Sequence, residues 1–385
     1  MDSMKIAFVT THEILGPNNT GGIQCALRNL SLLKTIFSEE NVLVCAITKN
    51  TDNLSKASRT VAVFTIKRGR IATIKNFLSG RLRYEKAIEN EVIKHISNFG
   101  CTAVFMDRSV MGFLQERIPK HIIQILFIHN IERIYVLNQA RVRLFWLLLL
   151  IPTIISESKA IKSSDIIISL NKRDASHLKK YYNRIPDLII PITFDDQFVI
   201  VKKKEKSCSS SFLQLLFVGS LFAPNEQGVT WFIQNVMPYV NAELTVVGRN
   251  FEGLTQKLSR KNVRIIGTVE DLPQWYSQAD AIVSPILFGD GMKVKTAEAL
   301  MFGKPMFATN EALEGYDIEG QRNVFRCNTA QDFISAINTY SSNPPYMTFD
   351  MKIRELFLQK YHTRAYIPVL HDTLKKLTSG GLSKP

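Results

Sequence analysis

The sequence predicts a protein built from two doubly wound α/β domains. Three observations indicate this fold class. The chain has 385 residues, which is too long for one compact core. Short apolar runs alternate with segments of helical periodicity, as in a parallel sheet covered on both faces. The alternation stops at the polar run KKKEKSCSSS (202–211) and then starts again. Two Rossmann-like domains that face a central cleft are therefore expected.

The elements of the first domain follow from its apolar runs. KIAFVT (5–10) is expected to be a strand, and apolar residues at helical spacing in 21–33 predict the first helix. Further strands are expected at 41–47, 60–66, 102–107, 122–129 and 165–170.

The second half repeats the pattern. Its strands are expected at 213–220, 242–248, 262–268 and 280–287. We predict an N-terminal domain over 1–200, a linker over 201–211 and a C-terminal domain over 212–360.

Composition narrows the class of protein. With 45% hydrophobic and 21% charged residues the chain is typical of a soluble protein. Its five cysteines include no CxxC pair, which argues against a disulfide framework or a zinc site and favours a reducing compartment. The N-terminus lacks a cleavage-site pattern, so we expect no signal peptide and a cytoplasmic protein.

The positive charge is concentrated in the first half. The formal net charge is +14, and residues 1–196 hold 27 Lys+Arg against 17 Asp+Glu. Such a surplus suits nucleic acid, anionic lipid or phosphate-bearing ligands, or simply solubility. The sequence has no helix-turn-helix spacing, zinc-finger pattern or aromatic RNA-binding strand, so a nucleic-acid partner is not expected.

The segment RVRLFWLLLLIPTII (141–155) is the longest apolar stretch, and it is shorter than a membrane span requires. The interpretation that we prefer is a buried helix of the first domain. The alternative is an interfacial helix or a hydrophobic acceptor wall, with its arginines facing lipid phosphates and Trp146 at the boundary.

The stretch FGDGMKVKTAEALMFGKP (288–305) carries the strongest signal of a binding site. A strand, a tight turn and the N-terminus of a helix that starts near Met292 form an arrangement that binds anions. Asp290 would lie in the turn and Glu298 ~9 Å further along the helix axis. Two carboxylates so placed suit an elongated hydroxylated ligand, such as a nucleotide sugar. The N–H groups of Gly291, Met292 and Lys293, with the Lys293 or Lys295 ammonium, would hold its central anion. The alternative is a surface helix with a Lys295–Glu298 pair.

The ends of two strands in the first domain carry weaker candidates. Gly21 and Gly22 lie in the loop before the first helix, where small residues let an anion approach free N–H groups. A plain turn is the alternative. His129 ends the strand LFIH, from which it could donate to a sugar hydroxyl or a phosphate. The alternative is a histidine that caps the next helix.

Taken in order, these motifs resemble those of retaining glycosyltransferases of the GT-B fold, in the large group 1 family (family 4 of the sequence classification). The family's glycine-rich first loop resembles Gly21–Gly22, and its donor-lining histidine resembles His129. Its later loops resemble VGS, VVGR and GTVEDL, and its acid-x7-acid signature resembles Asp290 and Glu298. The resemblance implies donor binding by Gly219, Ser220, Gly248, Arg249, Val269, Gly291, Met292, Lys293, Lys295 and Glu298. It also implies a C-terminal helix, 361–385, that crosses back to the first domain.

Two departures from the family pattern concern the donor phosphates. The first acid is usually Glu and is Asp290 here. Many relatives carry Arg or Lys in the loop after VG, whereas SLFAPNEQG has neither, so Lys293 and Lys295 are our candidates for the counter-charge.

The resemblance implies transfer of a sugar from a nucleoside diphosphate sugar, more commonly UDP- than GDP-linked, to a hydroxyl with anomeric retention. Asp290, Glu298 and His129 would be the catalytic residues. No divalent-metal motif sits at a strand end, so we expect neither a metal nor another cofactor.

The acceptor is expected to be a glycan or a polyprenyl-diphosphate-linked sugar in bacterial surface polysaccharide assembly, at the inner face of an anionic membrane. The basic residues that suggest this are Arg59, Lys67, Arg68, Arg70, Lys75, Arg81 and Arg83. A solvated basic face is the alternative. Rival functions are a sugar-nucleotide epimerase, for which no internal acid/base set is found, and an inactive homologue that acts as a scaffold or membrane-docking partner.

Overall fold

The structure is a computed structural model. It describes residues 4–16, 20–66, 76–77, 79–81, 84–141, 143–198, 212–289, 291–342 and 347–378. Asp290, the expected linker over 201–211, and five of the basic residues (Lys67, Arg68, Arg70, Lys75 and Arg83) lie outside the described residues. Their roles stay predictions.

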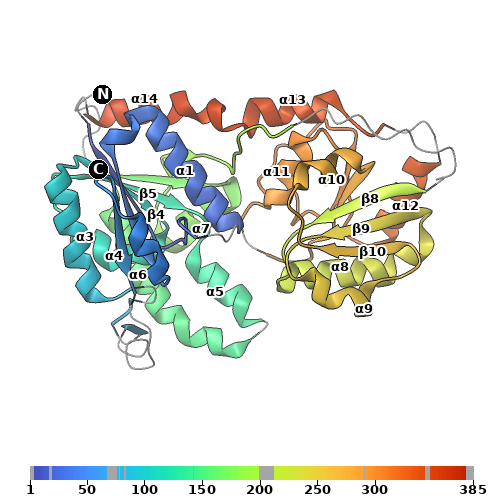
Figure 1. The fold of residues 1–385 in the computed structure, drawn as a ribbon, viewed down its shortest axis with the longest axis horizontal. Coiled ribbons are helices and arrows are strands. Elements are labelled where there is room, and N and C mark those ends of the chain that lie inside the picture. Colours follow the sequence, from blue (N-terminus) through green and yellow to red (C-terminus); the bar gives the residue numbers. More distant parts are fainter. Residues whose placement is uncertain are drawn as a thin grey trace. The chain divides into compact units, whose positions relative to one another are not determined.

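The chain divides into two compact units, each described here by itself. Unit 1 runs from the N-terminus to Pro191 and takes up the chain again at Tyr366. Unit 2 is Ile192–Ala365. Each unit contains one sheet in which all strands are parallel, as the continuous apolar runs predicted (Figure 1).

Unit 1 has a seven-stranded sheet in the order β3-β2-β1-β4-β5-β6-β7. The strand order reverses between β1 and β4, where Thr10 pairs with Asp107. In sheets of this kind, ligands bind at the carboxyl ends of the strands beside such a switch point. The strands are β1 (Ile6–Thr10), β2 (Val42–Thr48), β3 (Val61–Thr65), β4 (Ala103–Asp107), β5 (Ile123–Ile128), β6 (Ile166–Ser169) and β7 (Leu188–Ile189).

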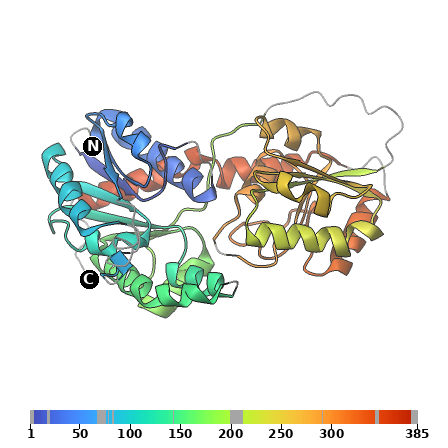
Figure 2. The ribbon, with the colours of Figure 1, turned by 60° about the horizontal axis from the view of Figure 1, so that its bottom comes forward.

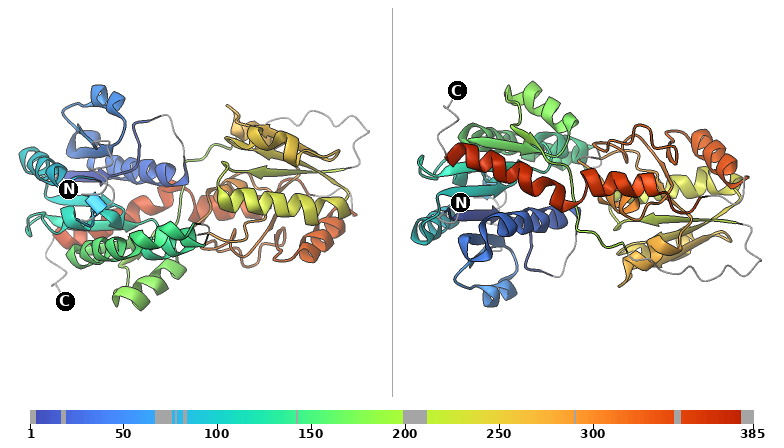
Figure 3. Two further views of the ribbon diagram at one scale, coloured as in Figure 1. Left: turned by 90° about the horizontal axis from the view of Figure 1, so that it is seen from below. Right: turned by 90° about the horizontal axis from the view of Figure 1, so that it is seen from above.

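Helices occupy the crossovers of unit 1. The α-helices are α1 (Gly21–Phe37), α3 (Lys86–Phe99), α4 (Gly112–Gln115), α5 (Glu132–Ala140), α6 (Leu150–Ser163), α7 (Lys172–Tyr182) and α14 (Ile367–Thr378). The 3-10 helices are η1 (Glu39–Asn41), η2 (Thr51–Lys56), η3 (Ser109–Met111) and η4 (Leu144–Leu149). The last helix, α14, packs against α1, the first one (Figure 3, right).

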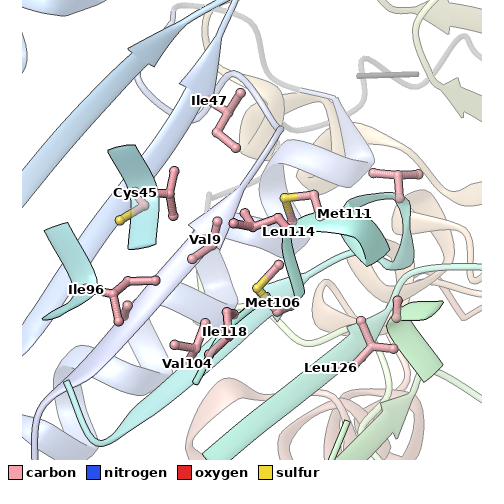
Figure 4. Packing of buried hydrophobic residues seen from close by; sticks show 14 of the residues in the cluster. Val9, Cys45, Ile47, Ile96, Val104, Met106, Met111, Leu114, Ile118 and Leu126 are labelled. Atoms are coloured by element: carbon pink, nitrogen blue, oxygen red, sulfur yellow. The ribbon is translucent and has the colours of Figure 1, made fainter. Parts of the chain in front are cut away.

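Apolar side chains on one face of this sheet form a buried cluster in unit 1. Val9, Val104 and Met106 of β1 and β4 meet Met111 and Leu114 of the segment that follows β4 (Figure 4). All five are buried. Branched and sulfur-containing side chains fill the space between the sheet and its helices, which fixes the strand ends in place.

Unit 2 has a six-stranded sheet in the order β10-β9-β8-β11-β12-β13, with its switch point between β8 and β11. The strands are β8 (Leu213–Val218), β9 (Ala242–Val247), β10 (Val263–Gly267), β11 (Ala281–Ser284), β12 (Met306–Ala308) and β13 (Val324–Arg326). Helix α8 runs along this sheet (Figure 2). The helices are α8 (Ala223–Asn235), η5 (Met237–Tyr239), η6 (Phe251–Leu254), α9 (Thr255–Leu258), α10 (Leu272–Gln278), α11 (Val294–Met301), α12 (Ala330–Ser341), α13 (Met351–Lys360) and η7 (Thr363–Tyr366).

The apolar segment 141–155 does not form the buried helix that we expected from the sequence. We preferred a buried helix, but η4 contains no buried residue, and Leu144 and Leu148 are 76% and 68% exposed. Only the later part of α6 enters the core. The sequence pattern did not reveal this, because a run that is apolar all round fits a buried helix and an exposed one equally.

Candidate functional site

Two glycine loops meet at the carboxyl ends of β8 and β9 in unit 2. A Cβ on Gly248 would lie 1.8 Å from the carbonyl oxygen of Gly219, so only glycine permits this approach. Leu221 N donates to the carbonyl of Arg249 at 2.9 Å. The structure therefore brings together Gly219, Ser220, Gly248 and Arg249, four of the residues predicted for donor binding.

Helix α11 starts later than predicted. It runs from Val294, with Lys293 as its N-cap, whereas the sequence suggested a start near Met292. Thr296 N already donates to the carbonyl of Lys293 at 3.0 Å. Gly291 and Met292 thus precede the helix, and both are buried. The free N–H groups of the helix mouth therefore lie two residues further along the chain than we expected.

Lys295 is buried beside the Gly219 loop. Its side chain is 8% exposed, and its Nζ donates to Asn225 Oδ1 at 2.7 Å and lies 4.0 Å from the centroid of the Phe217 ring. Burial lowers the pKa of Lys295 well below its usual range. The alternative interpretation of a surface Lys295–Glu298 pair is wrong, because the lysine points into the unit and not to solvent.

Asn225 joins Lys295 to the loop after β8. Its Nδ2 donates to the carbonyl of Ser220 at 2.7 Å, while its Oδ1 accepts from Lys295. Asn225 lies in the first turn of α8 and is buried. Asn225 was not identified from the sequence, because a polar residue early in a helix looks like an ordinary helix start.

Lys293 occupies a different environment from Lys295. Its Nζ forms an ion pair with Glu311 Oε1 at 2.6 Å and also donates to the carbonyl of Gly291 at 2.8 Å. Of the two lysines that we considered as counter-charges for a diphosphate, Lys295 adjoins the glycine loop and Lys293 is neutralised by a carboxylate.

Glu298 is held by a buried tyrosine. Tyr276 Oη donates to Glu298 Oε2 at 2.8 Å, and the Tyr276 ring stacks on Phe302 with centroids 4.9 Å apart. Burial raises the pKa of Glu298, which Tyr276 and Lys295 partly offset. The hydrogen bond fixes one carboxylate oxygen and orients the other. Tyr276 was also missed, since it lies 22 residues before its partner.

The loop after β10 carries Val269, another predicted donor-binding residue, which is half-buried. Two residues later Asp271 caps α10, its Oδ1 accepting from Gln274 N at 3.2 Å. The acid of the GTVEDL motif therefore starts a helix.

A second polar cluster lies at the switch point of unit 1. Asp107, at the end of β4, accepts from Thr10 Oγ1 at 2.9 Å and from Asn29 Nδ2 at 2.9 Å. His129 Nε2 lies 2.8 Å from Asp107 Oδ1. The interpretation of His129 as a helix cap is wrong, because Ile131 is the N-cap of α5. Asp107 was missed, although a strand that ends in an acid is a usable signal.

Charges in this cluster stabilise one another. Burial lowers the pKa of His129, but the Asp107 carboxylate and the Cys25 thiol more than offset this and raise it to about 10. Burial raises the pKa of Asp107, and His129 reverses the effect, leaving it at about 2. Despite burial, His129 and Arg28 lower the pKa of the Cys25 thiol. At neutral pH, His129 is a cation held against an anion.

Gly21 and Gly22 form the first turn of α1 and not a loop before it, so that prediction is corrected. Thr20 caps the helix, accepting from Ile23 N at 3.4 Å. A Cβ on Gly22 would lie 2.6 Å from His12 Cε1, so this glycine makes room for the His12 ring, which is 5.0 Å from that of His129.

Backbone strain marks the same strand end. Arg108, directly after Asp107, has φ 114°, which side chains rarely adopt and which costs about 1–3 kcal/mol. Its guanidinium is fixed by Glu132 Oε1, with NH2 at 2.7 Å. Strain of this kind gathers at functional sites.

His12, Asp107 and His129 also form the one group among the described residues whose ligand atoms are close enough for a metal, within 4.8 Å of one another. The oxygens of Asp107 already accept hydrogen bonds from Thr10, Asn29 and His129. An ion would have to replace these bonds, so the hydrogen-bond network accounts for the cluster.

Part of the chain matches the sequence model of a known protein family. Residues 213–343 match the sequence model of the family "Glycosyl transferases group 1". No curated protein matches the chain. The matched region contains the glycine loops, Asn225, Lys295, Tyr276 and Glu298.

Solved structures resemble the whole chain. Sucrose-phosphate synthase from Thermosynechococcus elongatus is 15% identical, with a TM-score of 0.74 over 98% of this chain and 100% of the other. HepE from Anabaena, solved with UDP and glucose, is 14% identical, with a TM-score of 0.67 over 97% and 100%. The lipopolysaccharide outer core galactosyltransferase WaaB is 12% identical, with a TM-score of 0.65 over 97% and 100%. The predicted fold class, a two-domain Rossmann-like GT-B fold, is confirmed.

Proposed function

We propose that the protein transfers a sugar from UDP to a hydroxyl group of a glycan or a lipid-linked acceptor, with retention of the anomeric configuration. The observation that carries the proposal is the placement of Lys295 and Asn225 against the Gly219 loop at the switch point of unit 2. This is where a doubly wound sheet binds nucleotides. Uridine as the base is supported by HepE, which was solved with UDP-glucose.

Unit 2 is proposed to hold the donor. The loop after β8 has no side-chain bulk at Gly219, so a diphosphate can approach its backbone and the Lys295 amine. Glu298, oriented by Tyr276, is proposed to accept hydrogen bonds from the ribose hydroxyls. Asp290 is proposed to contact the donor sugar, on the strength of the family resemblance alone.

The chemical step is the exchange of one bond to the anomeric carbon. The bond to the leaving phosphate oxygen breaks, and a bond to the acceptor oxygen forms on the same face. The acceptor's proton passes to the departing phosphate oxygen, so no separate protein base is required. Lys295 and backbone N–H groups would stabilise the charge that develops on the diphosphate. The role of His129 at the donor sugar rests on the family resemblance alone, and the reaction is proposed to be metal-independent.

The acceptor is proposed to belong to surface polysaccharide assembly at the cytoplasmic face of a membrane. The basic surplus of residues 1–196 supports an anionic acceptor, and the neighbour WaaB is a lipopolysaccharide outer core galactosyltransferase.

Thermal unfolding in the presence of UDP, GDP, ADP and CMP, without added metal, tests the donor site. A nucleotide at 100 times its Kd adds about 2.7 kcal/mol to the free energy of unfolding, which raises the Tm measurably. We expect UDP to stabilise the wild type and to have little effect on Glu298→Ala. If no nucleotide stabilises the wild type, the donor-site proposal fails and an inactive homologue is the better interpretation. If GDP acts in place of UDP, only the base is wrong.

A further inference from the structure

The surface formed by η4 and the start of α6 is unusually apolar for one in contact with solvent. We call it the apolar face and define it by six exposed residues. These are Leu144 (76% exposed), Phe145 (54%), Leu147 (47%), Leu148 (68%), Ile151 (69%) and Ile155 (44%). A contiguous set of large apolar side chains on a monomer surface marks an interaction site. In Figure 1, α5 and the helical segment after it lie below the sheet of unit 1.

The remainder of α6 is anchored in unit 1. Ser156 Oγ donates to the carbonyl of Val110 at 2.9 Å and accepts from Gly112 N at 3.2 Å. Glu157 accepts from Ser109 Oγ at 3.0 Å and from Glu132 N at 2.7 Å. Contrary to the expectation from the sequence, Leu144–Ser163 has the length and composition of a membrane span. Spanning would break these bonds and move the Glu157 side chain into lipid, so the face suits a helix that lies on a membrane.

The unpaired exposed charges on the elements that carry the apolar face have one sign, whereas Lys159 of α6 is paired with the exposed Glu116. Arg141 and Arg143 precede it and are exposed, and Lys162 is exposed at the other end of α6. The acids of residues 132–163 are Glu132 and Glu157, and both are buried. Glu132 is paired with Arg108. The apolar face therefore has a basic rim with no exposed carboxylate from its own elements.

This charge pattern indicates which partner binds the apolar face. A second copy that met the face across a two-fold axis would place the same basic rim against itself, without an acid to offset it. An anionic bilayer offers hydrocarbon to the leucines and phosphates to the arginines. Trp146 is half-buried at the edge of the apolar face. Its ring lies edge-on to that of Tyr135, with centroids 5.9 Å apart. Aromatic residues with a polar group suit the headgroup region.

We propose that the apolar face is a docking surface for an anionic lipid bilayer, with Leu148 and Ile151 inserted among the acyl chains and Arg141 and Arg143 at the phosphates. The inference stands apart from the proposed transferase activity, because it concerns a surface outside the donor site and is measured without substrate.

Cosedimentation of the full chain with lipid vesicles tests the proposal. We expect binding to vesicles that contain 30% phosphatidylglycerol in phosphatidylcholine, and much weaker binding to pure phosphatidylcholine. Neutralising Arg141→Gln and Arg143→Gln together should weaken the binding about fivefold per arginine. The pair Leu148→Ser and Ile151→Ser should weaken it at least about tenfold per residue, also at high salt, where the arginines contribute little.

Matched control variants distinguish binding by the apolar face from non-specific hydrophobic adsorption and from an effect of net charge. Lys94→Gln with Lys120→Gln removes the same two charges from exposed positions elsewhere in unit 1, and Leu54→Ser removes a leucine that is 49% exposed. Both should bind vesicles like the wild type. Equal losses in the controls, or none in the Leu148/Ile151 pair, would overturn the proposal. Self-association abolished by that pair, with no vesicle binding, would overturn it in favour of a dimer interface.

Discussion

A methyl group on Gly219 would lie 2.8 Å from Lys295 Nζ and 2.6 Å from Asn225 Nδ2. The glycine at the end of β8 is therefore the reason that a lysine from α11, 76 positions later in the chain, can lie against this loop. The arrangement places a buried amine against the backbone of this loop, where the diphosphate is proposed to bind.

Substituting this glycine is expected to damage both packing and binding. Gly219→Ala forces Lys295 or Asn225 to move, which should lower the free energy of unfolding by about 1–3 kcal/mol and weaken UDP binding. Gly253→Ala is the matched control, because nothing lies within 4 Å of its added Cβ. Urea unfolding and UDP titration of both variants make the comparison. Wild-type affinity in Gly219→Ala would place the diphosphate elsewhere.

Binding of UDP should depend on pH through Lys295. Burial holds the pKa of its amine well below 10.5 in the free protein, and an adjacent diphosphate would raise it again. Between the two pKa values binding takes up a proton, so the affinity should fall as the pH rises, by up to about tenfold per pH unit. Calorimetry in two buffers of different ionisation enthalpy measures this uptake. Lys295→Met should abolish the uptake, whereas Lys293→Met should keep it.

The hydroxyl of Tyr276 is expected to act through Glu298. Tyr276→Phe keeps the ring on Phe302 and removes one hydrogen bond to the carboxylate, a loss of ~0.5–1.5 kcal/mol. UDP binding should therefore weaken roughly threefold to tenfold.

Binding of 2′,3′-dideoxy-UDP, which lacks the ribose hydroxyls, separates a positioning role from a structural one. This ligand should bind Tyr276→Phe and the wild type equally, since Glu298 has nothing to accept from it. A similar loss for both ligands would mean that Tyr276 merely supports the fold. Tyr239→Phe, at a residue that is 65% exposed, is the control.

The ion pair of Asp107 and His129 should make the stability of unit 1 depend on pH. The pKa of His129 is raised from 6.5 to about 10, so its contribution is complete below pH 6.5 and disappears as the pH rises through about 10. The pKa of Asp107 is lowered from 3.8 to about 2, so its contribution is present above pH 3.8 and is lost as the pH falls through about 2. The pair therefore stabilises most between about pH 4 and 6.5.

Asp107→Asn should lower the free energy of unfolding by about 3–5 kcal/mol in that window, because it leaves a buried charge unpaired. The difference from the wild type should shrink towards pH 10. Urea unfolding at several pH values measures it, with the exposed Asp52→Asn as the control. A difference that does not vary with pH would contradict the ion pair.

Local pattern was sufficient to predict most of the strands, but the short strands β7, β12 and β13 were not predicted. The expected strand 102–107 matches β4 (Ala103–Asp107) within one residue. The expected strand 280–287 is shorter, since β11 ends at Ser284, before a proline that has no N–H for the ladder. Apolar runs between helices carry this information because a parallel strand is buried on both faces.

Most residues of the candidate site were named from the sequence, but the contacts between them were not predicted. Glu298, Lys295 and the glycines of unit 2 were all named in advance, but the residues that contact them were not. Asn225, the partner of Lys295, is 70 residues away from it, and no local pattern encodes such a pairing. The same holds for Asp107, which meets His129 because β4 and β5 are neighbours. Long-range partners follow from strand order, which the sequence pattern leaves open.

The division of the chain has a consequence for how unit 1 is made. Its sheet is encoded before Ile192, but α14, which packs on α1 with Leu370 and Leu374 buried, is encoded after all of unit 2. A ribosome that adds ~5–20 residues per second needs on the order of ten to thirty seconds to pass through unit 2. During that interval the face of α1 that α14 later covers stays uncovered in the nascent chain.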